Sequence, residues 1–202
     1  MGVKVRIKTT KDITGDMLKN INKLNKKSVE VGVLSGENKW LAGIHEYGAN
    51  IVAKNAKYLT VPVHPDAVGK RAGSFSDLIF IESKKGNKFL ARKKGNNDIE
   101  LMYWLTPSVK IPERSFLRAG HDTYIDEVLK KTEKAIGLVI KGKMSQEQYL
   151  NMVGQMLSSK IKEYARDLSS PPNSKITSAA KGSNNPLIDT GGMIEGITHR
   201  IK

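Results

Sequence analysis

The spacing of apolar and polar residues changes several times along the chain, and each period predicts a different element. In residues 3–8, valine or isoleucine alternates with lysine or arginine, which is the pattern of a strand with one solvated face. Apolar residues then recur at helical spacing over residues 17–24, after a predicted N-cap at Thr14. Alternation returns at residues 29–33. The chain is therefore predicted to open as strand, helix, strand.

A short helix and a group of strands follow. Residues 40–47 suit a helix, and Gly48 after it is a candidate for a left-handed C-terminal position. Within residues 51–110 the pattern becomes strand-like, and the tetrapeptide Lys-Lys-Gly-Asn occurs at 84–87 and again at 93–96. Each copy places a glycine between two apolar runs, where a hairpin needs a positive φ angle. These features predict a three-stranded antiparallel meander inside an inserted β-rich subregion, residues 51–110.

The second half of the chain has the pattern of two amphipathic helices joined as a hairpin. Apolar residues follow three- and four-residue steps over residues 116–139, and Gly142 ends this helix. Ser145 with Gln148 three residues later is a capping-box pattern that begins the next helix. Residues 169–185 are rich in proline, serine and asparagine, and they are predicted to form a mobile loop before an ordered final stretch.

Composition limits both the fold and the compartment. The chain has 202 residues, of which 39% are hydrophobic and 6% aromatic, so it fits one domain, residues 1–202, with an aliphatic core. It contains no cysteine, which excludes disulfides and thiolate metal sites. The start alternates charge with aliphatic residues, and no later apolar run approaches about 18 residues. We therefore expect a soluble protein that is neither exported nor inserted in a membrane.

The net charge is +14, which attracts polyanions. Residues 51–110 hold 11 Lys/Arg against 5 Asp/Glu, a net of +6. The candidates for contact with nucleic-acid phosphates in this subregion are Lys84, Lys85, Arg92, Lys93 and Lys94. Its phenylalanines alternate inside apolar strands and are predicted to pack in a core rather than to stack on bases. The pattern favours nonspecific contact with DNA and gives no support for sequence-specific recognition.

One segment resembles a catalytic motif. Asp189-Thr190-Gly191 follows two aliphatic residues, as in aspartic peptidases, where two such carboxylates share a proton. That chemistry needs a flap and a second supporting strand downstream, and eleven residues follow Gly191. The structural interpretation, which we favour, is that Asp189 or Thr190 caps a short helix while Leu187 and Ile188 anchor the segment to the core.

The histidines and the remaining glycine-rich segment do not have the spacing of a metal or phosphate site. His45-Glu46 lacks a second histidine four residues on. The other histidines stand apart along the chain: His64, His121 and His199. The glycines of residues 69–74 lack phosphate-loop spacing, so a solvated loop is the better interpretation. The sequence thus predicts no metal, no cofactor and no enzymatic activity.

Four segments in a fixed order carry a family resemblance. They are His45-Glu46-Tyr47-Gly48, Tyr58-Leu59-Thr60-Val61-Pro62, Ile111-Pro112-Glu113-Arg114-Ser115-Phe116-Leu117 and Pro186-Leu187-Ile188-Asp189-Thr190-Gly191. In this order they resemble the tail-completion or head-tail joining proteins of tailed bacteriophages, especially the Mu-like virion morphogenesis proteins. The likeness spans most of the chain. The departures are Glu113 and Ser115 in place of alanine and proline, Met193 in place of leucine, and a longer segment at 51–110.

The resemblance implies an α+β subunit, with a small antiparallel β-sheet packed against two long helices, that forms a hexameric ring in the phage neck. The implied neighbours are head-tail connector or adaptor proteins on one side and the tail terminator or tail tube protein on the other. Genomic DNA would pass through the channel without sequence readout. The implied location is the virion, with host cytoplasm during assembly, and no catalysis is implied. A freestanding, nonspecific nucleic-acid-binding protein is the alternative.

The matched motifs supply the expected structural or interface residues. These are His45, Glu46, Tyr47, Gly48, Pro112, Arg114, Phe116, Leu117, Leu187, Asp189, Thr190 and Gly191. We expect the segment from Pro112 to Leu117 to fix the start of the long helix, with Phe116 and Leu117 buried and Arg114 available for a charge-assisted contact. His45, Glu46 and Tyr47 are expected to pack beside it.

Overall fold

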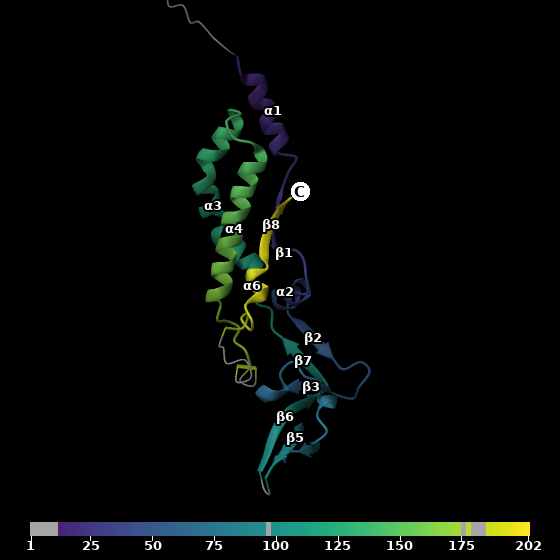
Figure 1. Cartoon of the computed structure of the whole chain (residues 1–202). Helices are drawn as coiled ribbons and strands as arrows, with labels where there is room; N and C mark the ends of the chain where they lie inside the picture. Colours follow the sequence, from purple (N-terminus) through teal and green to yellow (C-terminus); the bar gives the residue numbers. More distant parts are fainter. Residues whose placement is uncertain (1–11, 96–97, 175–176, 179–184) are drawn as a thin grey trace, which may run out of the picture.

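The protein is elongated, with a helical body at one end and a β-rich end at the other (Figure 1). The computed structural model describes residues 12–95, 98–174, 177–178 and 185–202. In chain order the elements are α1 (Thr14–Leu24), β1 (Val29–Val33), α2 (Asn38–Tyr47), β2 (Ala49–Val52), β3 (Leu59–Pro62), η1 (Pro65–Ala67), η2 (Ala72–Ser74), β4 (Leu78–Glu82), β5 (Lys88–Lys94), β6 (Asp98–Thr106), β7 (Ser108–Ile111), α3 (Phe116–Ile140), α4 (Gln146–Asp167), α6 (Gly192–Glu195) and β8 (Ile197–Ile201). The predicted α+β class is confirmed.

The helical body is built on the predicted hairpin of α3 and α4, which pack along each other (Figure 1). Gly142 ends α3 with a φ of 70°, and the Ser145–Gln148 capping box begins α4 as predicted. Apolar side chains at three- and four-residue steps put one face of each helix into a shared core. The fully buried members of this core include Phe116, Val128 and Ile161.

A two-stranded sheet covers one side of α4. Strand β1 pairs antiparallel with β8, so that Val29 lies opposite Ile201 and Val33 opposite Ile197. The sheet brings an early and a late part of the chain together, and Val33 and Ile197 are buried in the helical core. The strand predicted at residues 3–8 lies outside the described residues.

The start of α1 differs from the prediction. Thr14 is the first residue of the helix, not its N-cap, which is Ile13. The side chain that binds the free backbone groups belongs to Asp12, whose carboxylate accepts a hydrogen bond from the Thr14 N–H at 2.9 Å. An aspartate serves as well as a threonine in this role, so the apolar spacing alone did not show which of the two would be used.

The β-rich end contains a four-stranded antiparallel sheet in the order β3–β6–β5–β4. Strands β4, β5 and β6 are the predicted meander, and β3 adds a fourth strand alongside β6. Both hairpin glycines have the expected positive φ, 80° at Gly86 and 76° at Gly95. A small second core lies under this sheet, where Met102 and Tyr103 are buried with Ala67. The Tyr103 hydroxyl donates to the Lys70 carbonyl at 3.0 Å.

The ribbon of β2 and β7 connects the two ends of the molecule (Figure 1). Strand β2 leaves α2, and β7 leads into α3, with Ala49 opposite Ile111 in the antiparallel register. The orientation of the β-rich end is therefore set where these two strands meet the helices. In the part of the chain that the structure describes, no helix combines the length and the apolar character needed to cross a bilayer.

The contact between β8 and α4 generates a test of this packing. Gly154 of α4 faces the His199 side chain of β8, and a Cβ added there would lie 2.4 Å from His199 Cδ2. We expect Gly154→Ala to lower the free energy of unfolding by about 1–3 kcal/mol, because the imidazole must be displaced. Gly137→Ala is the control, since no atom lies within 4 Å of its added Cβ. The control should raise the free energy of unfolding by up to about 1 kcal/mol through helix propensity. Urea unfolding measures this free energy for both variants, and a stabilising Gly154→Ala would contradict the contact between α4 and His199 of β8.

Candidate functional site

Two of the resembling segments, far apart in sequence, meet at the end of α2. Residues 45–48 end α2, residues 111–117 end β7 and begin α3, and hydrogen bonds join the two segments. The third segment, residues 186–191, leads into α6, which contacts α2. We call these three segments together the motif joint. The fourth resembling segment, residues 58–62, lies in the β-rich end as part of β3.

The Glu46 carboxylate is the buried centre of the motif joint. Glu46 is 2% exposed, and its two oxygens accept hydrogen bonds from Leu117 N at 2.8 Å and Arg118 N at 3.1 Å. The first turn of a helix has free N–H groups and a positive dipole end, so a carboxylate there is stabilised by both. Ser115, the N-cap residue, makes no side-chain capping bond. Glu46 therefore caps α3 through a hydrogen bond from a residue 71 positions later in the chain.

Arg118 closes the same centre from the solvent side. Its Nε donates to the Glu46 carboxylate at 2.8 Å, and its Nη2 donates to the Glu46 carbonyl at 3.1 Å and to Glu113 at 2.6 Å. The guanidinium also lies 4.7 Å from the centroid of the Tyr47 ring, which is a cation–π distance. The hydrogen bond to Glu46 is the main cause that raises the pKa of Arg118. Sequence reasoning missed Arg118, because it lies just after the resembling segment, which ends at Leu117.

Gly48 lets the chain turn from α2 into β2 in direct contact with the second motif. Its φ is 71°, which confirms the predicted positive angle, but its ψ of 167° is not that of the left-handed helix. A Cβ at this position would lie 2.8 Å from Glu113 N and 3.0 Å from the Ile111 carbonyl oxygen. Glycine is required here for two reasons: the positive φ angle and the close approach of the backbone of residues 111–113.

Arg114 is the second buried charge of the motif joint. It is 6% exposed, and its Nη1 lies 3.0 Å from His45 Nδ1. Its other nitrogens donate to the carbonyls of Pro171 and Pro172 and to the side chain of Asn173, at 3.0, 3.3 and 3.4 Å. Burial lowers the pKa of its guanidinium. The structure therefore places Arg114 inside the protein, where it makes its charge-assisted contacts with its own chain.

These contacts hold the beginning of the segment predicted to be a mobile loop. Residues 171–173 are fixed on Arg114, and most of the later part, residues 175–176 and 179–184, lies outside the described residues. Of the other predicted residues, Phe116 is fully buried. Leu117 is partly buried against the helical core, and Tyr47 is 67% exposed. His45 and Glu46 pack beside the start of α3 as predicted, whereas the capping role of Glu46 was not foreseen.

The third motif anchors the C-terminal segment, as the structural interpretation predicted. Leu187 is buried, at 4% exposure, and Gly191 precedes α6 with a φ of 82°. The predicted cap by Asp189 or Thr190 is wrong, because the N-cap of α6 is Gly191 and no side chain makes a capping hydrogen bond. The Thr190 hydroxyl lies 3.5 Å from the N–H of Gly192, the first helical residue, whereas a cap binds the second or third. Asp189 is exposed, unlike a carboxylate held beneath a glycine turn. Leu187 and Ile188, which precede Asp189, therefore anchor the segment through apolar contacts with the helical core.

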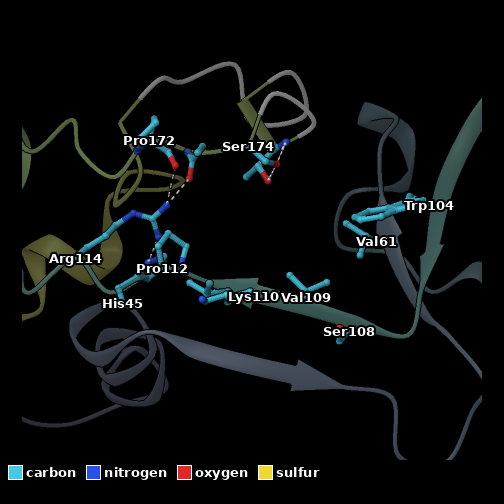
Figure 2. A pocket seen from close by; sticks show the side chains of 13 residues that line it. His45, Val61, Trp104, Ser108, Val109, Lys110, Pro112, Arg114, Pro172 and Ser174 are labelled. Atoms are coloured by element: carbon cyan, nitrogen blue, oxygen red, sulfur yellow. Dashed lines mark hydrogen bonds between the residues drawn. The ribbon is translucent and has the colours of Figure 1, made fainter. Parts of the chain in front are cut away.

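A pocket of about 540 Å³ lies between the motif joint and the β-rich end. Figure 2 shows Arg114 and His45 at one side of it and Trp104 and Val61 at the other, with Pro172 and Ser174 along a third side. Among the described residues, its lining combines apolar side chains with the cations Arg114 and Lys110 and contains no carboxylate. Such a lining can receive an apolar or acidic side chain.

The five candidate cations of the meander do not form one patch. Lys84 and Lys85 lie in the turn before β5, and Lys93 and Lys94 lie at the other end of this strand, so about 20 Å of extended chain separates the pairs. Arg92 donates to Glu100 at 2.8 Å and to Asp66 at 3.2 Å, and Lys94 contacts Glu100 at 2.6 Å. Two of the five cations, Arg92 and Lys94, are thus paired with carboxylates of the β-rich end.

Comparison with known proteins adds no relative. No protein-family model matches this chain, and neither a curated protein nor a solved structure matches it. Among the described residues, no three His, Cys, Asp or Glu side chains gather in a way that could hold a metal ion.

The buried cap generates a mutational prediction. Glu46→Ala leaves two helix N–H groups and the Nε–H of Arg118 without their acceptor, so we expect a loss of about 2–4 kcal/mol in the free energy of unfolding. Glu46→Gln, which keeps one acceptor oxygen, should lose less. Glu113→Ala is the matched control, because it removes the exposed partner of the same arginine; we expect a change below about 1 kcal/mol. Equal effects at residues 46 and 113 in urea unfolding would contradict the capping role.

The Glu100 cluster generates a pH prediction. Hydrogen bonds from Lys94 and then Arg92 lower the pKa of Glu100 to about 2. A carboxyl group with a lowered pKa stabilises the folded state above its unfolded pKa, and this contribution disappears as the pH falls towards the folded value. The stability difference between the wild type and Glu100→Gln should therefore be present near neutral pH and shrink between pH 4.5 and about 2. Asp77→Asn, at an exposed carboxylate, is the control. A difference that grows on acidification would refute the assignment.

Proposed function

We propose that this protein is a structural component of the virion of a tailed bacteriophage. In this proposal it forms a ring at the neck, completes the tail, joins it to the DNA-filled head and lets DNA pass. The observation that carries the proposal is the motif joint: of the segments that resemble one family in order, two are joined by hydrogen bonds at the end of α2, and the third leads into α6, which packs on α2. At that place the motif residues connect elements, through a helix cap, a glycine contact and an anchored terminus.

The physical role of the motif joint suits a building block. A closed ring repeats one contact between unlike surfaces, so a small error in subunit shape accumulates around the ring. Glu46, Arg118 and Gly48 fix the angle between the helical body and the ribbon that leads to the β-rich end. A rigid angle at this point keeps the repeated contact geometrically constant.

Exposed aromatic residues beside the motif joint support assembly. Trp40 is 71% exposed and Tyr47 67%, and the two lie seven residues apart on α2, which places them on the same face of the helix. Gly43 between them leaves a shallow hollow that both rings line. Tryptophan and tyrosine in such positions are typical of protein interfaces. We propose this face of α2 as part of the contact with a ring neighbour or with a connector or tail protein.

The charge of the protein suits a DNA channel. The net charge is +14, and Lys84, Lys85 and Lys93 are exposed on the β-rich end. Dispersed lysines attract the phosphate backbone without fixing a register, so DNA can slide past them. These lysines also favour the second candidate, a nonspecific DNA-binding protein. That candidate requires the isolated subunit to bind duplex DNA with an affinity that falls steeply with salt.

The test of the proposed function is particle assembly without the protein. In a phage that encodes this chain, a nonsense mutation in its gene should give DNA-filled heads and separate tails in electron micrographs. Supplying the wild-type gene in trans should restore joined particles. A Trp40→Ser/Tyr47→Ser gene should restore fewer of them, and Phe80→Ser, at an exposed ring on β4, is the matched control. Normal joined virions in the absence of the protein would end the proposal.

A further inference from the structure

Strand β1 has one unpaired edge. Ser28 and Lys202 exchange both backbone hydrogen bonds, at 3.0 and 2.9 Å, so they form a hydrogen-bonded pair of the antiparallel ladder. Such pairs alternate along a ladder, and the residues between them direct N–H and C=O away from the partner strand. Val29, Val31 and Val33 therefore point their backbone groups away from β8. Among the described residues no other strand pairs with this edge.

A groove of about 800 Å³ runs beside that edge. One wall is β1 itself, and the other is the beginning of α3, with Leu117 and Ile125. Side chains of α4, including Leu157 and Ile161, also line it. The groove lies where a third strand of the β1–β8 sheet would run, with backbone partners on one side and apolar side chains beneath it. An occupant needs an extended backbone with one apolar face and one solvated face.

Residues 3–8 of this chain have that pattern. Val3, Val5 and Ile7 occupy alternate positions, and the residues between them are lysine or arginine. With its aliphatic face towards α4, such a strand exposes its cations at the mouth of the groove. Both acidic and basic side chains lie there: Glu30 and Asp122 on one hand, Lys39 and Arg118 on the other. Glu30 already pairs with Arg200 and Lys202, so the orientation of the strand is argued from its aliphatic face alone.

The position of the chain start favours a neighbouring copy over the same copy. The described chain begins at Asp12, at the end of α1 farthest from β1 (Figure 1). Helix α1 has 11 residues, which spans about 16 Å, and four more residues separate it from β1. A fully extended stretch between Asp12 and Val5 reaches only about 23 Å. To reach β1 of its own copy, this stretch would have to run back along α1 and the four connecting residues. That path is longer than the stretch, which would end before the middle of β1.

We propose that residues 3–8 of one copy add to the free edge of β1 in a neighbouring copy, as the third strand of its β1–β8 sheet. This inference rests on the ring proposed above and names one of its subunit contacts. The contact joins unlike surfaces, an arm and a groove, and such a contact repeated by a closing rotation gives a ring. The backbone ladder supplies affinity, while the aliphatic side chains above α4 set the register.

Cysteine pairs test the contact directly, because the chain contains no cysteine. One tagged copy carries Lys4→Cys or Arg6→Cys, and a differently tagged copy carries Glu30→Cys, all on the solvated face. After mild oxidation we expect a disulfide between the two tagged copies for at least one arm position. Lys85→Cys in place of Glu30→Cys is the control and should give none. Absence of the arm-to-β1 disulfide would overturn the proposal. An intrachain disulfide in a double variant, without the disulfide between copies, would do so too.

A backbone substitution separates this contact from the ring itself. Val31→Pro removes an N–H that points away from β8, so the β1–β8 ladder keeps its hydrogen bonds while the free edge is blocked. We expect a folded protein by circular dichroism whose self-association weakens at least about tenfold. Val31→Thr is the control and should associate like the wild type. Rings that persist in Val31→Pro, seen by mass photometry, would overturn the arm contact and leave the proposed function standing. The proposed function is tested separately: it is wrong if joined virions form without the protein.

Discussion

The buried carboxylate of Glu46 under the first turn of α3 is the interaction on which the rest of the structure depends. A charge taken out of water is tolerated only where its hydrogen bonds are replaced. Two backbone N–H groups of α3 and the Arg118 guanidinium replace them. The end of α2 is therefore fixed on the beginning of α3. Because β2 leaves α2 and β7 enters α3, the same contact also sets the direction of the β-rich end.

A second buried charge extends this arrangement to the C-terminal part of the chain. The Arg114 guanidinium binds carbonyl and amide oxygens near residues 171–173 and contacts His45. Neutral acceptors compensate a buried cation less well than a carboxylate does, and burial accordingly lowers the pKa of this group. The buried guanidinium therefore needs several acceptors at the same time. Because these acceptors belong to residues 171–173, the segment after α4 is fixed on the motif joint.

Two solvent-exposed surfaces outside the cores have the properties of protein contact surfaces. The face of α2 with Trp40 and Tyr47 is apolar and aromatic, and β1 has an unpaired edge above an apolar groove. Exposed strand edges and aromatic faces promote association. In a soluble monomer such features are usually covered. Their presence together beside a rigid joint is the physical argument for a subunit of an assembly.

The sequence by itself determined the local elements. Alternation and helical spacing predicted β1, the meander, and the α3–α4 hairpin, since side-chain periodicity follows directly from backbone geometry. Gly86, Gly95 and Gly142 marked their turns, because positive φ angles are intrinsic to glycine. The Ser145–Gln148 capping box was equally local. The motifs also predicted that residues 45–47 pack beside the start of α3.

Only the tertiary structure decided how these elements are joined. Glu46 caps a helix that begins 70 positions later, Arg118 lies just after the resembling segment, and Arg114 is buried inside the protein. No periodicity encodes these pairings, because a buried charge selects whichever partners the complete fold brings near. The lysine pairs of the meander show the same limit. They look alike in sequence, yet the direction of β5 places them at opposite ends of one strand.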